Sequence, residues 1–542
     1  MQLHKNQQLE LTVDSFGAQG EGIARWNGMP VFIPRALPGE RVRVQIVKAD
    51  KRFAFGRALE ILTPSPDRRE PPCPYYVQCG GCVCQHMSYE AQLAFKRSQV
   101  AGCMRHIAGI DVEVAPVLGM EEPWHYRNKI SMPVSGQIGA PAIGYYAQRS
   151  HRVVDVQRCL LSCDAADRAC AAVRQWMAEQ RVPPYNEESH TGLVRHIMTR
   201  VNRAGQLMLV LVINGRQLKK QKELLDLLQK AVPELVSLCV SPNEKRGNVI
   251  LGDSYQVLWG QERLEDTLCG NRFLLSPLSF FQVNPQQTEK LYNTALDFAN
   301  LTGGETVADL YCGAGTISLL LARRAAHVTG IEIVPDAIRD ARENARRNGV
   351  ENVDFLCGPA EDILPQLVEK GMRPDVVVLD PPRKGAEPAV LQAILTCAPQ
   401  RVVYVSCNPA TQARDVKILC AGGYQPQRCQ PVDMFCQTAG VETVILLSQQ
   451  KPDTTIRVGI DLKPEDVTAA ESKATYADLK AYIEEKYGFK VSNLYIAQAK
   501  AAMGIKEREN YNLPKSEKSR QPVCPPEKMK AIQEALHHFK MI

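Results

Sequence analysis

The sequence predicts a multidomain α/β protein whose last large domain is built on a mostly parallel β-sheet. The chain has 542 residues, which at roughly 100–200 residues per domain corresponds to three or four domains. Hydrophobic residues make up 45% and charged residues 23%, values typical of a globular protein with a sizeable core. Strand-like and helix-like segments alternate regularly after about residue 275, which is typical of a parallel sheet covered on both faces.

Changes of pattern divide the chain into five segments. Evenly spaced short strands and glycine-rich turns in the first segment predict an OB-like β-barrel. The segments are the barrel at 1–62, a cysteine segment and helix at 63–108, a β-rich central mixed domain at 109–270, the α/β domain at 271–450 and a small helical extension at 451–542.

The predicted elements follow from the apolar spacing. In the α/β domain we predict strands at 306–310, 327–333, 353–357, 375–379, 401–406 and 441–447. Helices are predicted at 88–107, 217–231, 476–487 and 528–539, the second being the one clear helix of the central domain. The polar stretch 506–520 is predicted to be a loop.

The composition allows a nucleic-acid partner, because the net charge is +6, but does not require one. No run of about 18 uncharged apolar residues is present, and residues 9–13 read as a strand instead of a secretory signal. We therefore expect a cytoplasmic protein without a membrane span. In that compartment the 18 cysteines are expected to remain reduced.

The predicted barrel combines basic residues with aromatic ones. Positive charge and flat faces suit single-stranded nucleic acid. An aromatic side chain in a small barrel is equally explained as core, and for each single one we favour the core. The aromatics are Trp26, Phe32, Phe53 and Phe55, and the basic residues are Arg35, Arg41, Arg43, Lys48, Lys51, Arg52 and Arg57.

A glycine turn follows the first strand of the α/β domain. Gly313 and Gly315 allow a ligand to approach the backbone, and the helix that follows supplies free N–H groups. The next strand leads to Glu332, about 20 residues on, where a carboxylate can accept hydrogen bonds from ribose hydroxyls. Ser318 stands where a dinucleotide site prefers glycine, so S-adenosylmethionine fits better than NAD.

Two further strands end in reactive side chains. The sequence VVVLDPPRKG leaves Asp380 at a strand end, and VVYVSCNPAT leaves Cys407 at the next one. Pro381 restricts Asp380 to an extended conformation. Because open α/β sheets bind ligands at the carboxyl ends of their strands, these groups are expected to face one crevice.

These motifs resemble the RNA uracil-5-methyltransferase family, which includes bacterial 23S rRNA and tRNA enzymes. The resemblance covers about residues 1–448, and the barrel looks like the RNA-binding TRAM domain of that family. It implies a class I (Rossmann-like) methyltransferase domain. The matching pieces are FFQVNP at 280–285, DLYCGAGT at 309–316, DPPRKG at 380–385, SCNP at 406–409 and Glu442.

The resemblance implies a role for each of six residues. Those expected to contact S-adenosylmethionine are Gln282, Tyr311, Glu332 and Asp380, while Cys407 is expected to be the nucleophile and Glu442 the general base. Many members carry histidines just before this glutamate, whereas here the stretch is FCQTAGVE. The carboxylate is retained without those histidines.

This chemistry explains why a cysteine and a base are needed. A thiolate that adds to C6 of uracil makes C5 nucleophilic toward the methyl sulfonium, and a base then removes the C5 proton so that the thiol can leave. Because the thiolate is the reactive form, we expect the pKa of Cys407 to be depressed. The target uridine is expected to be flipped out of its stack, since both ring faces must be reached.

A cysteine group lies upstream of these motifs. The spacing C-x5-C-x2-C with one remote cysteine suits an iron–sulfur cluster, with zinc as the chemical alternative. Family members carry a [4Fe–4S] cluster on this pattern, which implies Cys73, Cys79, Cys82 and Cys159 as ligands. Cys84 and Cys163 lie close enough in sequence to compete with them.

Several functions compete at this point. We favour methylation of 23S rRNA at uridine C5, by a monomeric chain, because tRNA enzymes of this resemblance usually lack both the TRAM domain and the cluster cysteines. The alternatives are a tRNA uracil-5-methyltransferase, an amino-methyltransferase, which needs no cysteine at 407, and an inactive RNA-binding scaffold. In the segment WHYRNK at 124–129, which resembles a family motif, Arg127 and Lys129 could hold phosphate or base, or the segment is simply a strand.

Overall fold

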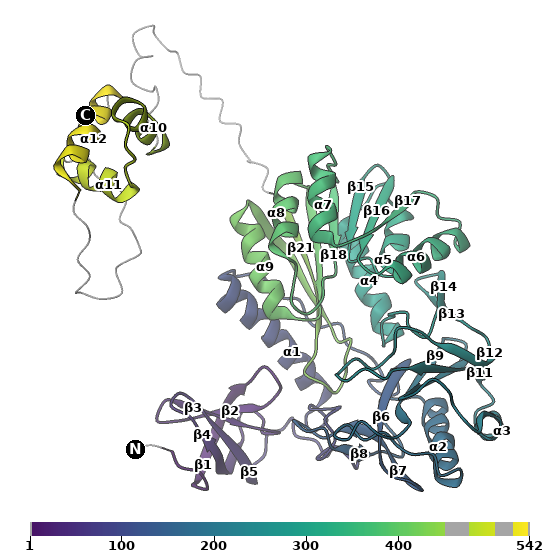
Figure 1. Cartoon of the computed structure of the whole chain (residues 1–542). Coiled ribbons are helices and arrows are strands. Elements are labelled where there is room, and N and C mark those ends of the chain that lie inside the picture. The colour runs from purple at the N-terminus through teal and green to yellow at the C-terminus, as the bar shows by residue number, and fades with distance from the viewer. Residues whose placement is uncertain (1–2, 450–475, 504–523, 540–542) are drawn as a thin grey trace. The chain divides into compact units, whose positions relative to one another are not determined.

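The computed structural model describes residues 3–449, 476–503 and 524–539. The chain divides into two compact units, Met1–Lys451 and Pro452–Ile542. The first unit holds a closed β-barrel, two seven-stranded sheets and a two-stranded hairpin, which are taken in chain order below (Figure 1).

The N-terminal body is a closed five-stranded barrel in the order β1-β2-β3-β5-β4. Side chains of alternate residues fill its interior, for example Val42, Val44 and Ile46, as the two-residue period of a strand requires. The predicted barrel is therefore confirmed. The strands are β1 (Gln8–Phe16), β2 (Gly22–Trp26), β3 (Met29–Ile33), β4 (Arg41–Ala49) and β5 (Ala54–Thr63).

Three of the four barrel aromatics lie outside the core, so the prediction of core placement is wrong for them. They are Phe32, Phe53 and Phe55, whose ring centroids lie 5.6 to 6.1 Å apart. Val31 and Ile33 point into the barrel, so the strand period directs the residue between them outward. Trp26, the fourth aromatic, packs against the core.

The central body is a seven-stranded sheet in the order β12-β11-β10-β9-β6-β7-β8. Helices α2 (Asp164–Glu179) and α3 (Gln221–Ala231) share a hydrophobic core with one face of it. The prediction of a single helix in this domain was wrong, although Ala169, Val173 and Trp176 carry the apolar spacing of α2. The strands are β6 (Lys129–Gln137), β7 (Ala140–Tyr146), β8 (Val153–Asp155), β9 (Val194–Val201), β10 (Leu207–Ile213), β11 (Leu235–Pro242) and β12 (Gln256–Gly260).

A hairpin, β13 (Leu264–Leu268) and β14 (Asn271–Leu275), leads into the α/β body. Its sheet has the order β17-β16-β15-β18-β19-β21-β20, in which the first five strands are parallel and β21 runs antiparallel between β19 and β20. This Rossmann-like arrangement confirms the predicted fold class. The strands are β15 (Thr306–Leu310), β16 (His327–Glu332), β17 (Val353–Cys357), β18 (Val376–Leu379), β19 (Arg401–Ser406), β20 (Tyr424–Val432) and β21 (Glu442–Gln449).

Strand β20 was not predicted. It contains Pro426 and Pro431, which in a sequence argue against a strand. An edge strand tolerates proline because one side of its backbone is not needed for pairing, and β20 lies at the end of the sheet order.

Helices cover both faces of this sheet with two hydrophobic cores (Figure 1). The predicted helix at 88–107 is present as α1 (Tyr89–Cys103) followed by a π-helical turn, Met104–Ala108, and it packs into one of these cores. The other helices are α4 (Pro285–Ala299), α5 (Thr316–Ala322), α6 (Pro335–Arg347), α7 (Ala360–Glu369), α8 (Pro388–Cys397) and α9 (Pro409–Ala421).

The second unit has its own small core. Helices α10 (Tyr476–Tyr487) and α12 (Pro526–His538) match two predicted helices, whereas α11 (Asn493–Ala502) was not predicted. Their apolar side chains, such as Ile483, Ile496 and Ile532, pack together. The loop predicted at 506–520 lies outside the described residues. Among the residues that are described, no helix has the length and apolar character needed to cross a bilayer.

A buried ion pair ties α1 to the segment that precedes β21. The ammonium of Lys96 donates to the carboxylate of Asp433 and, at 3.0 Å, to the carbonyl of Phe435, and both charged side chains are fully buried. The hydroxyl of Tyr89 donates to the other carboxylate oxygen at 2.7 Å. Two residues of α1, Lys96 and Tyr89, therefore provide hydrogen-bond donors to both oxygens of the Asp433 carboxylate.

Substitution of Lys96→Met is expected to lower the free energy of unfolding of the first unit by about 3–5 kcal/mol, because it leaves a buried carboxylate without its counter-charge. Urea unfolding followed by tryptophan fluorescence measures this unit alone, since all four tryptophans, at 26, 124, 176 and 259, lie in it. Lys245→Met removes an exposed ion pair with Asp253 and should change the value by less than about 1 kcal/mol. Equal effects of the two substitutions would contradict the prediction.

Candidate active site

The chemically active side chains meet at the carboxyl ends of the parallel strands of the α/β sheet. Cys407 directly follows β19 and Asp380 directly follows β18, the parallel strand beside it. Glu442 opens β21, whose next residue, Thr443, pairs with Ser406 in an antiparallel register. The antiparallel insertion of β21 therefore brings Glu442 to the end of the sheet where Cys407 lies.

The thiol of Cys407 is half-buried and faces two carboxylates. Burial raises its pKa, and the charges of Glu442 and Asp380 raise it further, while Arg383 opposes them. This direction is opposite to the predicted depression of the Cys407 pKa. The sequence placed all these groups at strand ends, but it did not show that two acids would flank one thiol.

The two carboxylates also act on each other. Burial raises the pKa of Asp380 to about 7. Glu442 is 3% exposed, and burial followed by the charge of Asp380 raises its pKa well above the ordinary carboxyl range. A carboxylate whose pKa is raised toward neutrality is a stronger proton acceptor when it is ionised, which suits a general base.

Arg383 is a site residue that the sequence analysis quoted within a motif without giving it a role. Its positive charge lowers the pKa of both Cys407 and Glu442. Its carbonyl accepts hydrogen bonds from Asn408 Nδ2 at 2.9 Å and from Thr411 Oγ1 at 3.2 Å, which join its loop to the loop of the cysteine. An arginine directly after Asp-Pro-Pro at a buried strand end was the available signal.

Tyr292 of α4 was also missed. Its hydroxyl lies 3.1 Å from Thr316 Oγ1. Burial raises its pKa, and Asp380 and Glu442 are among the charges that raise it further, so the phenol borders the acidic group. A tyrosine within an amphipathic helix carries no sequence signal that separates this position from the core.

Glu332 lies at the glycine turn as predicted. Its carboxylate accepts from the backbone N–H groups of Gly313 at 3.2 Å and Val334 at 2.9 Å. Gly313 has φ +54° and a Cβ there would meet open space, whereas a Cβ at Gly315 would lie 2.9 Å from the ring of Phe355. The first glycine thus leaves room for a ligand, and the second allows close packing.

Asp309 interacts electrostatically with both Glu332 at the glycine turn and Asp380 at the end of β18. It is fully buried and accepts a hydrogen bond from the hydroxyl of Ser318, the residue that stands where a dinucleotide site prefers glycine. Burial raises its pKa to about 7, and the charges of Asp380 and Glu332 contribute to that increase. Ser318 therefore has a structural role here, as the partner of a buried acid.

Gln282 and Tyr311 are placed less directly. Gln282 is 8% exposed, and its backbone carbonyl accepts a hydrogen bond from Asn128 Nδ2 at 3.1 Å. Tyr311 adopts φ +65°, but its hydroxyl lies near Glu361 and Glu387, where burial and these charges raise its pKa to about 12. The structure does not bring the phenol of Tyr311 to the acidic group.

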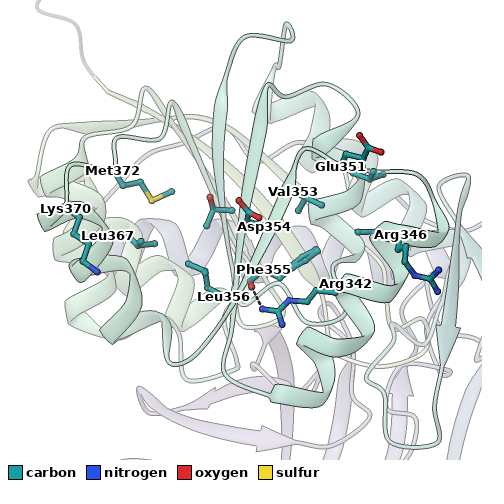
Figure 2. Close-up of a pocket in the computed structure, with 13 residues that line it drawn as sticks. Arg342, Arg346, Glu351, Val353, Asp354, Phe355, Leu356, Leu367, Lys370 and Met372 are labelled. Atoms are coloured by element: carbon teal, nitrogen blue, oxygen red, sulfur yellow. Dashed lines mark hydrogen bonds between the residues drawn. The ribbon is translucent and has the colours of Figure 1, made fainter.

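A wide hollow of about 930 Å³ lies along the edge strand β17 (Figure 2). None of the predicted site residues lines it. In Figure 2, Arg342 of α6 donates a hydrogen bond of 2.7 Å to the carbonyl of Phe355 and thereby covers one acceptor of this edge. The hollow is therefore separate from the candidate active site.

The four predicted cluster cysteines line one cavity of about 90 Å³, together with Arg127 and Tyr145 among others. Burial raises the pKa of Cys79, Cys82 and Cys159, and neighbouring thiols contribute to the increase for Cys79 and Cys82; the pKa of Cys82 reaches about 12. Cys84 and Cys163 do not line the cavity. Within the described part of the chain, no three His, Cys, Asp or Glu side chains are arranged to hold a metal ion.

Substitution of Arg383→Met is expected to raise the pKa of Cys407, because it removes the positive charge that opposes the two carboxylates. Alkylation of Cys407 by iodoacetamide at a fixed pH near 8 should slow by about two- to tenfold, since the thiolate is the reactive form. Mass spectrometry of the Cys407 peptide is needed, because the chain has 18 cysteines. The exposed neighbour Lys384, changed to Met, should leave the rate unaltered; an unchanged rate in the Arg383 variant would refute the prediction.

Comparison with known proteins identifies the family. Residues 301–428 match the family described as a methyltransferase domain, and residues 2–59 match the TRAM domain. An uncharacterized RNA methyltransferase of Halalkalibacterium halodurans is 48% identical over 82% of this chain and 98% of its own length, and one of Clostridium tetani is 47% identical over 82% and 97%.

A solved structure agrees with these relatives. The tRNA (uracil-54, C5)-methyltransferase of Pyrococcus abyssi, in complex with S-adenosyl-L-homocysteine, has a TM-score of 0.65 and 26% identity, covering 81% of this chain and 100% of that one. With the barrel, the Rossmann-like sheet and the motif order already described, these similarities show that the chain belongs to the RNA uracil methyltransferase family.

Proposed function

We propose that this RNA methyltransferase transfers a methyl group from S-adenosylmethionine to C5 of a uridine in 23S rRNA. The single observation that supports this most directly is the position of Cys407 opposite Glu442 at the edge of the sheet. A nucleophile and a proton acceptor on one strand pair are what addition to C6 and removal of the C5 proton require.

The residues around the glycine turn suit the cofactor. Glu332 is the proposed acceptor for its ribose hydroxyls, with open space at Gly313 beside it. Asp380 and Gln282 are the further proposed contacts, and Tyr311 would join them after rotation of its side chain. When bound, S-adenosylmethionine supplies the methyl group and the positive charge of a sulfonium.

In the proposed reaction, Cys407 and the carboxylates beside it act one after another. The thiol of Cys407 passes its proton to the carboxylate of Asp380, and the thiolate forms a bond to C6 of the base, which moves the electrons of the C5–C6 double bond toward C5. C5 then takes the methyl group, with S-adenosylhomocysteine as the leaving group. Glu442 takes the C5 proton, the C5–C6 double bond re-forms and the thiolate leaves. Arg383 favours the thiolate throughout, because its charge lowers the pKa of Cys407.

The sequence favoured 23S rRNA over tRNA because of the barrel and the cysteine group, but the tRNA methyltransferase of Pyrococcus abyssi aligns with 81% of this chain, so these segments do not separate the two substrates. Phe32, Phe53 and Phe55 form an aromatic cluster outside the barrel core, and the guanidinium of Arg149 lies 5.5 Å from the Phe55 ring centre. Such a surface suits unpaired RNA bases. A tRNA remains the second candidate, because the Pyrococcus abyssi protein is a tRNA methyltransferase.

Labelled S-adenosylmethionine should transfer its methyl group to C5 of uridine in unmodified 23S rRNA and not in tRNA. Nucleoside analysis of both RNAs after reaction identifies the atom and the substrate. Label at C5 of uridine in tRNA alone would keep the chemistry and refute the substrate. Label on an exocyclic amine would refute the chemistry and favour the amino-methyltransferase alternative.

Substitution of Cys407→Ala should abolish transfer, and Glu442→Gln should lower its rate on the order of 10²–10⁴-fold, as expected for loss of a general base. The Glu442 variant should also accumulate RNA that stays bound to the protein under denaturing conditions, because the thiol cannot leave. Cys357→Ala is the matched control, an exposed cysteine at the end of the parallel strand β17. Transfer that survives in Cys407→Ala would refute the covalent mechanism.

We further propose that the cavity lined by Cys73, Cys79, Cys82 and Cys159 holds a [4Fe–4S] cluster. The four cysteines that line this cavity match the donor set of such a cluster in number and type, but among the described residues no three of them are arranged to share one metal ion. Bound iron would keep the thiols ionised, whereas burial alone keeps them protonated. The proposed role is structural, since none of Asp380, Cys407 and Glu442 lines the cavity.

Protein purified without oxygen should contain about four iron and four sulfide per chain, in line with the cluster formula. Cys159→Ser should lose both, whereas Cys163→Ser should keep both, because Cys163 does not line the cavity. Metal analysis and sulfide release measure this directly. One zinc per chain without sulfide would refute the cluster and favour the zinc alternative.

A further inference from the structure

Two cations lie side by side on the central sheet, on the face opposite helices α2 and α3. Lys129 of β6 pairs in register with Arg200 of β9. The next residue of β6, Ile130, belongs to the core shared with α2 and α3, so the strand period directs Lys129 to the other face. The two positive side chains therefore share that face.

Neither cation has a carboxylate partner within the described residues, since no ion pair joins Lys129 or Arg200 to an acid there. Arg200 is 1% exposed, and its Nε and Nη1 atoms have no hydrogen-bond partner. Its Nη2 atom donates to the carbonyl of Ser279 at 2.6 Å. The guanidinium is thus held at one corner and unsatisfied at the other two nitrogens.

The charged groups around the pair do not balance it. Burial, together with the positive charge of the neighbouring Arg200, lowers the pKa of Lys129 to about 8. Asp266 is the acid that acts on Arg200, but its carboxylate accepts hydrogen bonds from the backbone of Arg203 at 3.0 Å and Thr267 at 2.8 Å. One acid thus faces two adjacent cations.

A buried charge without partners destabilises a protein unless something neutralises it. Unpaired donors of an arginine beside a lysine match the oxygens of an anion, and a phosphate in particular. The pair is therefore unfavourable in the free protein and becomes favourable when an anion is bound.

Two neighbouring features of the protein bear on which anion Lys129 and Arg200 would bind. Ser279, which Arg200 contacts, precedes Phe280, which is 71% exposed, and lies close in sequence to Gln282 of the proposed cofactor site. A hollow of about 740 Å³ opens where β6 begins and β9 ends; it is lined by Asn128 and Val201, the neighbours of the two cations in the chain, and not by Lys129 or Arg200 themselves. It is lined mainly by basic and amide side chains, among them Arg127, Asn128, Asn202, Arg203 and Lys290.

We propose that Lys129 and Arg200 together bind one phosphate of the RNA backbone close to the nucleotide that is methylated. The proposal rests on RNA as the substrate, which the family supports, but not on the choice of base, atom or RNA. It assigns the buried face of the central sheet to substrate binding. The hollow lined by Arg127, Arg203 and Lys290 would hold the neighbouring part of the RNA strand.

The test is RNA affinity without cofactor, measured for Lys129→Met across a series of KCl concentrations with a labelled 23S rRNA transcript and a tRNA transcript. We expect affinity for the transcript that binds more tightly to fall by about tenfold near 0.1 M salt, and the slope of log K against log salt to fall by about 0.7, the value for one lost phosphate contact to a single strand. Lys222→Met is the control, an exposed lysine on α3, across the same sheet.

Stability provides the second measurement. Because Lys129→Met removes the half-buried member of two adjacent cations, the melting temperature of the free protein should stay the same or rise. Arg200→Lys, which keeps the charge but not the forked donors, should weaken RNA binding while leaving the salt slope near its original value.

Two results would overturn the proposal. Unchanged RNA affinity and salt slope in Lys129→Met would mean that no phosphate is bound there. A raised KM for S-adenosylmethionine with unchanged RNA affinity would mean that the anion is the carboxylate of the cofactor. Because binding is measured without methyl transfer, an error in the proposed target base or atom would leave this result unaffected.

Discussion

The buried ion pair between Lys96 and Asp433 holds the segment that carries the proposed base to the rest of the protein. This segment runs from the end of β20 to Glu442 at the start of β21. Its backbone carbonyls accept hydrogen bonds from the cysteine segment, the central domain and the α/β domain in turn. The donors are Val83 N and Cys84 N to Gln437, Tyr126 Oη to Cys436 and Asn284 Nδ2 to Met434, at 3.0 to 3.2 Å. Three parts of the chain therefore determine where the carboxylate of Glu442 lies.

This arrangement gives the cysteine cavity a physical link to the chemistry. Cys82 lines the cavity, and Val83, the next residue, donates its N–H to Gln437 at 3.0 Å. Whatever holds the four thiols together also fixes this backbone, and through it the segment before Glu442. A cluster held by these cysteines would thus support the position of Glu442 through the backbone, with no role in the methyl transfer itself.

The sequence predicted the parallel strands and the residues at their ends, because both follow from local patterns. It could not predict that β21 lies between β19 and an edge strand, since β20 contains two prolines, and it is this insertion that places Glu442 beside Cys407. The outward position of Phe32 depends on strand register, and the side-chain direction of Tyr311 depends on packing, so neither is visible in a motif. The unpaired state of Arg200 requires knowing every neighbour of a buried side chain.

The charges of the two sheets are opposite, which suits two ligands of opposite sign. At the edge of the α/β sheet, Asp309, Asp380 and Glu442 all have raised pKa values, and only the charge of Arg383 opposes the last of them. Such a crevice stabilises a positive charge brought into it, and that charge would in turn lower the pKa of Cys407, because its proton is retained mainly by burial and by neighbouring carboxylates. The central sheet instead presents Lys129 and the buried Arg200, whose Nε and Nη1 atoms have no hydrogen-bond partner and would suit an anion. A positive charge in the crevice would therefore increase the fraction of Cys407 that is present as the reactive thiolate.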